Sequence, residues 1–157
     1  MSNFYSKYLG RAAQAQRSAA ARLSQKMSNL SSCVPKNKSD LEAAQSAVDV
    51  GYPGVEPILP ELLEWLQDYN WPVAHVLAPF LASIGEPLVP HVNRILETDD
   101  EVWKYWMIVS IMKESAVIAS SCRTYLQRLV KEPTEAEARE ELDQVAQEVL
   151  EQYGWAV

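Results

Sequence analysis

The stretch Glu56-Pro57-Ile58-Leu59-Pro60 returns thirty positions later as Glu86-Pro87-Leu88-Val89-Pro90. The acid, both prolines and the apolar positions keep this offset, and so do two leucines that close the pattern, Leu66 and Leu96. A further step of thirty reaches apolar or small positions without the prolines, namely Ile118, Cys122, Tyr125 and Leu126. We interpret this pattern as an internal repeat, because thirty residues suit two helices and two short loops.

The prolines predict how each repeat begins. Proline lacks an amide donor and has a backbone angle preset for a helix, so it suits a first turn. Pro57 and Pro87 fit that position, whereas Pro60 and Pro90 lie where a continuous helix would begin to need the missing amides. We therefore expect a short opening turn, a kink, and a regular helix from about Pro60 and Pro90.

Capping signals predict the other helix ends. The spacing of a capping box occurs twice, at Ser39 with Glu42 and at Thr134 with Glu137. The other expected N-caps are Asn70 and either Asp99 or Asp100, and the expected stops are Gly51, Gly85 and Gly154. Helices are expected near 40–50, 72–84, 101–114, 117–131 and 135–153. No segment alternates with a period of two, so the predicted fold is all-α, a solenoid of about three helical hairpins with extra N-terminal helices.

The charge of the chain is unevenly distributed. The 157 residues carry a net charge of −7, but residues 1–38 hold seven basic and no acidic side chains, which leaves −14 on residues 39–157. An acidic body disfavours direct binding of nucleic acid, because the phosphates would be repelled. It favours a basic protein partner, or serves solubility alone.

The basic segment predicts a separate leader helix over residues 1–32, followed by the domain at 33–157. This helix has an apolar face and a basic face. The apolar face carries Tyr5, Tyr8, Leu9, Ala12, Leu23, Met27 and Leu30, and the basic face carries Lys7, Arg11, Arg22 and Lys26. Such a helix can dock on the domain, bind an anionic surface, or act as a mitochondrial presequence. No apolar run is long enough to span a bilayer, and the far-separated Cys33 and Cys122 suggest free thiols. We expect a cytoplasmic protein, or a mitochondrial one if residues 1–30 are a presequence.

No pattern of catalytic, metal-binding or cofactor-binding residues rises above background. The two histidines, His75 and His91, fall on different predicted helices, and no spacing of Cys and His suits zinc. No glycine-rich phosphate loop occurs. We therefore expect no cofactor, no metal and no enzymatic activity, with catalysis by His75 or His91 as the least favoured alternative.

Aromatic and acidic residues alternate near the predicted repeat ends. An aromatic anchor with an acidic rim suits a basic protein segment. The candidate binding residues are Asp68, Trp71, Asp99, Asp100, Trp103 and Lys104. The competing interpretation is that both tryptophans pack between repeats and the acids cap helices.

Several motifs carry a family resemblance over residues 33–153. They are Tyr52-Pro53, the run from Glu56 to Asp68, Asn70-Trp71-Pro72-Val73-Ala74, Ile84-Gly85-Glu86-Pro87-Leu88, Pro90-His91-Val92, and Asp99-Asp100 with Trp103-Lys104-Tyr105-Trp106. This set resembles a small, mostly bacterial HEAT-like helical-repeat domain of unknown function. The resemblance implies a non-enzymatic binding module, for which an immunity-type inhibitor of a basic partner protein is one expectation. The alternative is a structural or targeting adaptor that uses the basic leader at a mitochondrial or membrane surface.

Overall fold

The computed structural model describes the backbone of residues 2–155 and the side chains of residues 13–25 and 29–155. Within this part of the chain every regular element is helical and no strand occurs, so the predicted all-α class is confirmed. The elements are α1 (Ser2–Ser31), α2 (Leu41–Val50), η1 (Glu56–Ile58), α3 (Leu59–Glu64), α4 (Pro72–Ile84), η2 (Glu86–Leu88), α5 (Val89–Leu96), α6 (Glu101–Met107), η3 (Ile108–Met112), α7 (Ala116–Ser121), α8 (Arg123–Lys131), α9 (Glu135–Arg139) and α10 (Leu142–Gln152).

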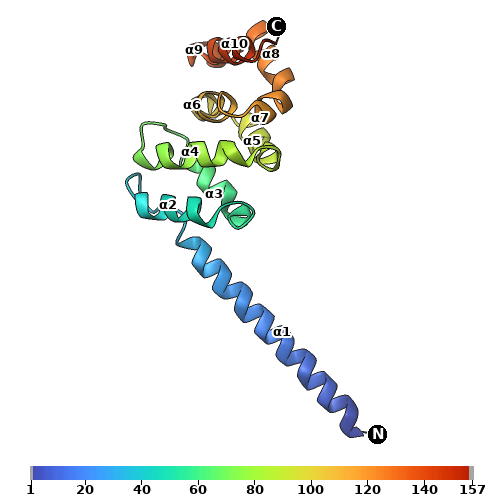
Figure 1. Ribbon diagram of the computed structural model, residues 1–157. Coiled ribbons are helices and arrows are strands. Elements are labelled where there is room, and N and C mark those ends of the chain that lie inside the picture. Colours follow the sequence, from blue (N-terminus) through green and yellow to red (C-terminus); the bar gives the residue numbers. More distant parts are fainter. Residues whose placement is uncertain (1, 156–157) are drawn as a thin grey trace.

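The helices after α1 lie in successive layers (Figure 1). Helix α2 packs on α4, α4 packs on η3, and α10 packs on α8, α6 and η3. The layer of α8, α9 and α10 therefore forms the end of the body that is farthest from α1.

The two proline-rich stretches form the same local structure thirty residues apart, as predicted. A single 3-10 turn, η1 or η2, opens each stretch and carries Pro57 or Pro87 at an early position. The α-helix that follows begins one residue before Pro60 in α3 and one residue before Pro90 in α5. The chain thus places each proline in a first turn, where its missing amide costs little.

The thirty-residue pattern also places apolar side chains in the core. Ile58, Leu62 and Leu66 are buried in the first copy. Their counterparts are buried too, namely Leu88, Val92 and Leu96 in the second copy and Ile118, Cys122 and Leu126 in the third. All nine belong to one continuous core, so each copy covers apolar surface that its neighbour could not cover alone.

Some predicted caps are correct and others are not. Asp100, Gly85 and the Thr134–Glu137 capping box are confirmed. The prediction of Ser39 as the cap of α2 is wrong, because Asp40 takes that place and accepts a hydrogen bond from the Ala43 amide. The prediction of Asn70 is also wrong. Trp71 is the residue before α4 and gives no side-chain cap, and the proline at the first helical position has no amide to be capped.

The predicted helices at 117–131 and 135–153 are each interrupted. Cys122 separates α7 from α8, and residues 140–141 separate α9 from α10. Glu141 adopts a left-handed backbone conformation with φ 59°. Neither break contains Gly or Pro, so no local residue signal marks it.

The helix predicted over 101–114 changes its hydrogen bonding halfway. After α6 the chain forms the π-helical turn η3, and the Lys113 amide donates to the Ile108 carbonyl at 3.1 Å. Side chains of α10 and the residue after it occupy the carbonyls left free at the end of this turn. Tyr153 Oη donates to the carbonyls of Met112 and Lys113 at 3.0 and 2.8 Å, and Gln152 Nε2 reaches the Lys113 carbonyl at 2.7 Å. These bonds fix α10 against the end of η3.

Helix α1 projects from the body instead of lying on it (Figure 1). All residues from 13 to 25 are exposed, and Leu23 is 61% exposed. Leu30, in contrast, is buried in the core, so the last turn of α1 packs with the body. The predicted apolar face at Tyr5, Tyr8, Leu9, Ala12 and Met27, and the basic residues Lys7, Arg11 and Lys26, lie outside the residues whose side chains are described.

Both cysteines are buried and unbonded to one another. In the described chain no single helix is long and apolar enough to cross a membrane, and only α4 taken together with residues 86–96, at a bend of 111°, meets that measure.

The repeat predicts matched losses of stability at Leu66 and Leu96. Leu66 is 0% and Leu96 8% exposed. Replacement by Ala removes buried methyl groups and leaves a cavity, so each change should lower the free energy of unfolding by about 2–5 kcal/mol, with the larger loss at Leu66. Urea denaturation measures both values. Leu23→Ala, at an exposed site, is the control and should cost under about 0.5 kcal/mol. Losses well under a kilocalorie at both core sites would contradict the repeat.

Candidate functional site

The residues predicted from the sequence to form one binding face have different roles in the structure. Asp68 is half-buried and holds its own turn, since its Oδ1 accepts from the Asn70 amide at 2.8 Å and from Asn70 Nδ2 at 2.9 Å. Trp71 is half-buried and packs edge-on against Trp65, with ring centroids 5.7 Å apart. The four side chains of Asp68, Asn70, Trp65 and Trp71 stabilise the connection between α3 and α4.

The second predicted group lies at the start of α6. Asp100 accepts from the Trp103 amide at 2.9 Å and so caps the helix, whereas Asp99 is exposed. Lys104 was predicted to belong to the binding face, but it is only 5% exposed, with its Nζ 3.5 Å from Glu101 Oε1. Lys104 is therefore removed from the predicted binding face, because a partner at the surface cannot reach the charge of a buried lysine.

Trp103 contributes to a mostly apolar hollow of about 180 Å³ between α3 and α5. The hollow is lined by Pro60, Leu63, Glu64, His91, Arg94, Ile95, Thr98 and Trp103. Burial lowers the pKa of His91, and the nearby Arg94 charge lowers it further. His91 is therefore neutral at physiological pH.

An aromatic row connects the α3–α4 loop to α6. Tyr69 packs on the His75 ring at 4.5 Å and stacks on Trp106 at 5.8 Å and 27°. Trp106 in turn meets Tyr105 edge-on at 5.0 Å. The row places Tyr105 at its outer end, toward α9 and α10.

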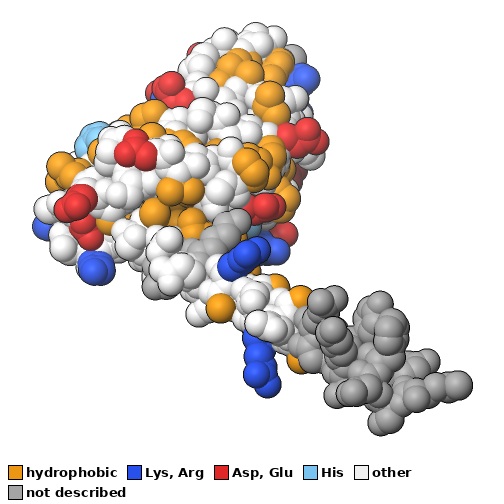
Figure 2. Space-filling model, turned by 60° about the horizontal axis from the view of Figure 1, so that its bottom comes forward, with side chains coloured by type: hydrophobic (Ala, Val, Ile, Leu, Met, Phe, Trp, Pro, Cys, Tyr) orange, Lys and Arg blue, Asp and Glu red, His pale blue; other side chains and the backbone are white. Residues whose placement is uncertain are grey.

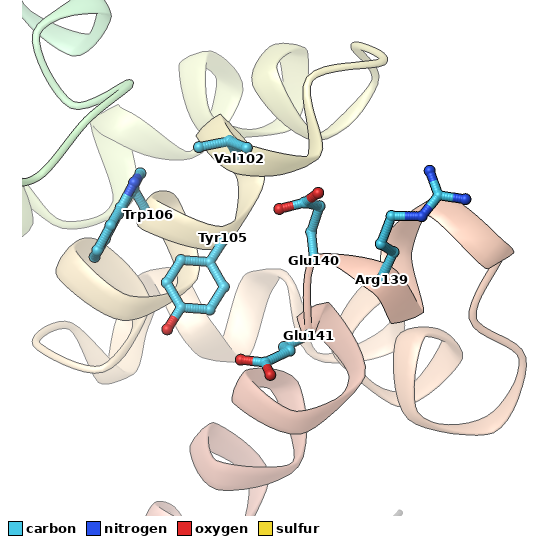
Figure 3. Close-up of a pocket in the computed structure, with 6 residues that line it drawn as sticks. All are labelled: Val102, Tyr105, Trp106, Arg139, Glu140 and Glu141. Atoms are coloured by element: carbon cyan, nitrogen blue, oxygen red, sulfur yellow. The ribbon is translucent and has the colours of Figure 1, made fainter.

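At that end lies a second hollow of about 210 Å³, which we call the acid–aromatic hollow. It is lined by Val102, Tyr105 and Trp106 of α6 and by Arg139, Glu140 and Glu141 of the α9–α10 connection. Figure 3 shows that the carboxylate of Glu141 points toward Tyr105 and that of Glu140 toward Val102, whereas the guanidinium of Arg139 points away from the hollow. In the described part of the chain neither carboxylate has a hydrogen bond or an ion pair. Two free carboxylates beside an aromatic ring suit a cationic group.

The backbone of Glu141 explains why its side chain faces this hollow. A left-handed conformation turns the chain between α9 and α10, and a residue with a Cβ adopts it at a cost of about 1 kcal/mol or more. Glu141 precedes the first residue of α10 but gives no side-chain cap, although its carbonyl accepts from the Val145 amide at 3.2 Å. The carboxylate is therefore not used to hold the helix end.

A salt bridge on the other side of α9 fixes the position of this connection. Glu137 receives Arg128 Nη1 at 2.5 Å on Oε2 and Nη2 at 2.6 Å on Oε1, and its Oε2 also accepts from the Thr134 amide at 2.8 Å. These bonds, the Arg128 pair first, lower the pKa of Glu137 to about 2. The acid is thus charged over the whole physiological range and ties α9 to α8.

No local signal in the sequence marks the acid–aromatic hollow. Residues 139–141 lie inside the segment predicted as one helix over 135–153. Tyr105 and Trp106 belong to the motifs of the family resemblance but are not among the predicted binding residues. The hollow forms only because residues thirty-five positions apart meet across two layers.

The fold and the site define an all-helical protein whose most distinctive surface feature is a hollow with aromatic and acidic walls. The chain belongs to the family described as a domain of unknown function (DUF5071), which it matches over residues 33–150. The match includes every residue of the acid–aromatic hollow and begins after α1. No curated protein matches the chain.

The Glu137 salt bridge predicts a pH-dependent part of the stability. The folded pKa of about 2 lies below the ordinary value of about 4.3, so the stabilisation is fully present above that ordinary value and is lost as the pH falls toward 2. Glu137→Gln should lower the free energy of unfolding by about 2–3 kcal/mol at pH 7, and the difference from the wild type should shrink between about pH 5 and pH 2. Denaturation at several pH values measures this. The exposed Glu135→Gln is the control, and a constant difference across that range would contradict the prediction.

The left-handed conformation predicts that glycine stabilises position 141. Glu141→Gly should raise the free energy of unfolding by about 0.5–1 kcal/mol, because glycine adopts positive φ without strain. Glu140→Gly is the matched control, since Glu140 has φ −90° and gains nothing from glycine. Thermal unfolding of both variants tests the assignment. A stabilisation at 140 equal to that at 141 would contradict it.

Proposed function

We propose that this protein is a binding module of the HEAT-like solenoid type that takes a basic segment of a partner protein into the acid–aromatic hollow. The observation that carries the proposal is the pair of unpartnered carboxylates, Glu140 and Glu141, which line the same hollow as the Tyr105 ring. A lysine or arginine side chain in this hollow gains charge attraction from the acids and a cation–π contact from the ring. The volume of about 210 Å³ suits one long side chain.

The charge of the whole body supports the same kind of partner. Residues 39–157 carry a net charge of −14, and acidic side chains are spread over the visible face of the body in Figure 2. Such a field speeds the encounter with a basic protein and makes it sensitive to salt. More specifically, we propose that the protein is an immunity-type inhibitor. Its partner would then be a toxin that exposes a basic surface.

The exposure of α1 favours a second candidate function, that of an adaptor. Residues 13–25 are all exposed and include Arg17 and Arg22 without any acid. A basic helix of this kind can be read by a targeting receptor or can bind an anionic surface, while the body holds its partner. Leader-dependent localisation in cells would support this role.

The proposed binding site predicts a specific loss of partner binding. Glu140→Gln with Glu141→Gln should weaken retention of a basic partner in pull-down experiments at least about tenfold, because both charges that face the bound cation are removed. Mass spectrometry of proteins held by the wild type identifies the partner, and titration of that purified partner measures the loss. The melting temperature of the variant should stay within a few degrees of the wild type, since neither carboxylate has an internal bond.

The exposed acids Glu61 and Glu86 give a matched control of equal charge change, because they lie on α3 and η2, away from the hollow. A third variant, Asp99→Asn, tests the edge predicted from the sequence. Equal retention by the wild type and the Glu140/Glu141 variant would contradict the proposed site, and a selective loss with Asp99→Asn would move the site to that edge.

A further inference from the structure

Helix α1 is a long basic helix whose residues 13–25 are left exposed by the body of its own chain. Its 30 residues span about 45 Å at 1.5 Å per residue. Between residues 13 and 25 every side chain is exposed, with Arg17 and Arg22 as the charged groups, and no acid occurs before Asp40. Such a helix lacks an opposite charge to pair with inside its own segment.

The way in which α1 joins the body sets its direction. Leu30 and Cys33 are buried in the core, and the Cys33 amide donates to the Leu30 carbonyl at 2.9 Å. Beyond this anchor α1 extends away from the α2 end, while the acid–aromatic hollow lies at the opposite end, between α6 and the α9–α10 connection (Figure 1). The leader of one molecule therefore cannot reach the hollow of the same molecule.

The leader can reach the hollow of a second copy of the protein. We infer that helix α1 of one copy docks its basic side chains in the acid–aromatic hollow of another copy. The inference rests on the proposed function and names an occupant for the same site. Charge complementarity supports it, because the segment with +7 and the body with −14 are parts of one chain and are always present at equal concentration.

The arrangement makes the contact heterologous. The donor surface is α1 and the acceptor surface is the hollow at the other end, so each copy keeps one free donor and one free acceptor after pairing. Contacts of this type continue into rings or open chains instead of stopping at a two-fold dimer. Because the interaction joins exposed charges, it should be strongest at low ionic strength.

The test is a charge swap in the full chain, followed by sedimentation velocity at about 20 mM and about 500 mM salt. The wild type should associate beyond the monomer at low salt and dissociate at high salt. Arg17→Glu with Arg22→Glu should weaken association at least about tenfold, and so should Glu140→Lys with Glu141→Lys. An equimolar mixture of these two variants should associate again, because the unchanged basic leader of the Glu140/Glu141 variant meets the unchanged hollow of the Arg17/Arg22 variant.

Control variants separate this contact from general charge effects and from the proposed function. The control variant, Glu61→Lys with Glu86→Lys, changes the charge of the body by the same amount as the Glu140/Glu141 variant but outside the hollow. This control should associate like the wild type. A wild type that stays monomeric at low salt would overturn the inference, as would failure of the mixture to associate. If the protein does not self-associate but still binds a basic partner protein through Glu140 and Glu141, the proposed function stands and only the inferred occupant is wrong.

Binding of a monomeric wild type to anionic phosphatidylserine vesicles through Arg17 and Arg22 would also overturn the inference, because α1 would then bind a membrane surface.

Discussion

The burial of matching apolar rows in successive layers is the constraint on which the rest of the structure depends. One turn and one short helix, such as η1 with α3, expose apolar side chains that they cannot cover themselves. At about 25 cal/mol per Å² of apolar surface, covering such a row is worth several kilocalories, which no single cap or salt bridge supplies. The stacking of layers then decides where the loops and helix ends lie, and so which charged side chains meet.

Local chemistry explains which parts of the fold could be predicted. Pro57 and Pro87 fix their own backbone angles, Gly85 takes a positive φ, and the Thr134 capping box is closed by two residues three positions apart. None of these depends on a distant contact. At Ser39 the neighbouring Asp40 takes the cap, and at Asn70 no side chain caps the helix, because it begins with a proline that has no amide. The break at Cys122 and the π-helical turn η3 contain no Gly or Pro that would mark them, and the carbonyls freed by η3 are satisfied by Tyr153, some forty residues away.

The candidate site was predicted in kind but not in place. The expectation of an aromatic anchor with acidic neighbours came from composition near the repeat ends, and Tyr105 and Trp106 lay within that region. The acids beside them in sequence are mostly used for structure, as Asp68 and Asp100 accept hydrogen bonds from their own loops. The free acids of the hollow, Glu140 and Glu141, come from a segment predicted as an uninterrupted helix. The left-handed turn at Glu141 breaks that helix where the two acids meet α6.

Acidic side chains of this protein therefore fall into two groups: those whose oxygens already accept hydrogen bonds within the protein, and those whose oxygens do not. Those of Asp40, Asp100 and Glu137 hold backbone amides or a guanidinium, and a partner could bind them only by displacing those donors. Glu140 and Glu141 give up only bound water when a cation arrives. Arg17 and Arg22 of α1 are exposed as well, but α1 starts from the other end of the body. Since charges in physiological salt are screened beyond about 8 Å, the two sets cannot neutralise each other within one molecule. Their attraction becomes effective only when two molecules, or this protein and a partner, come into contact.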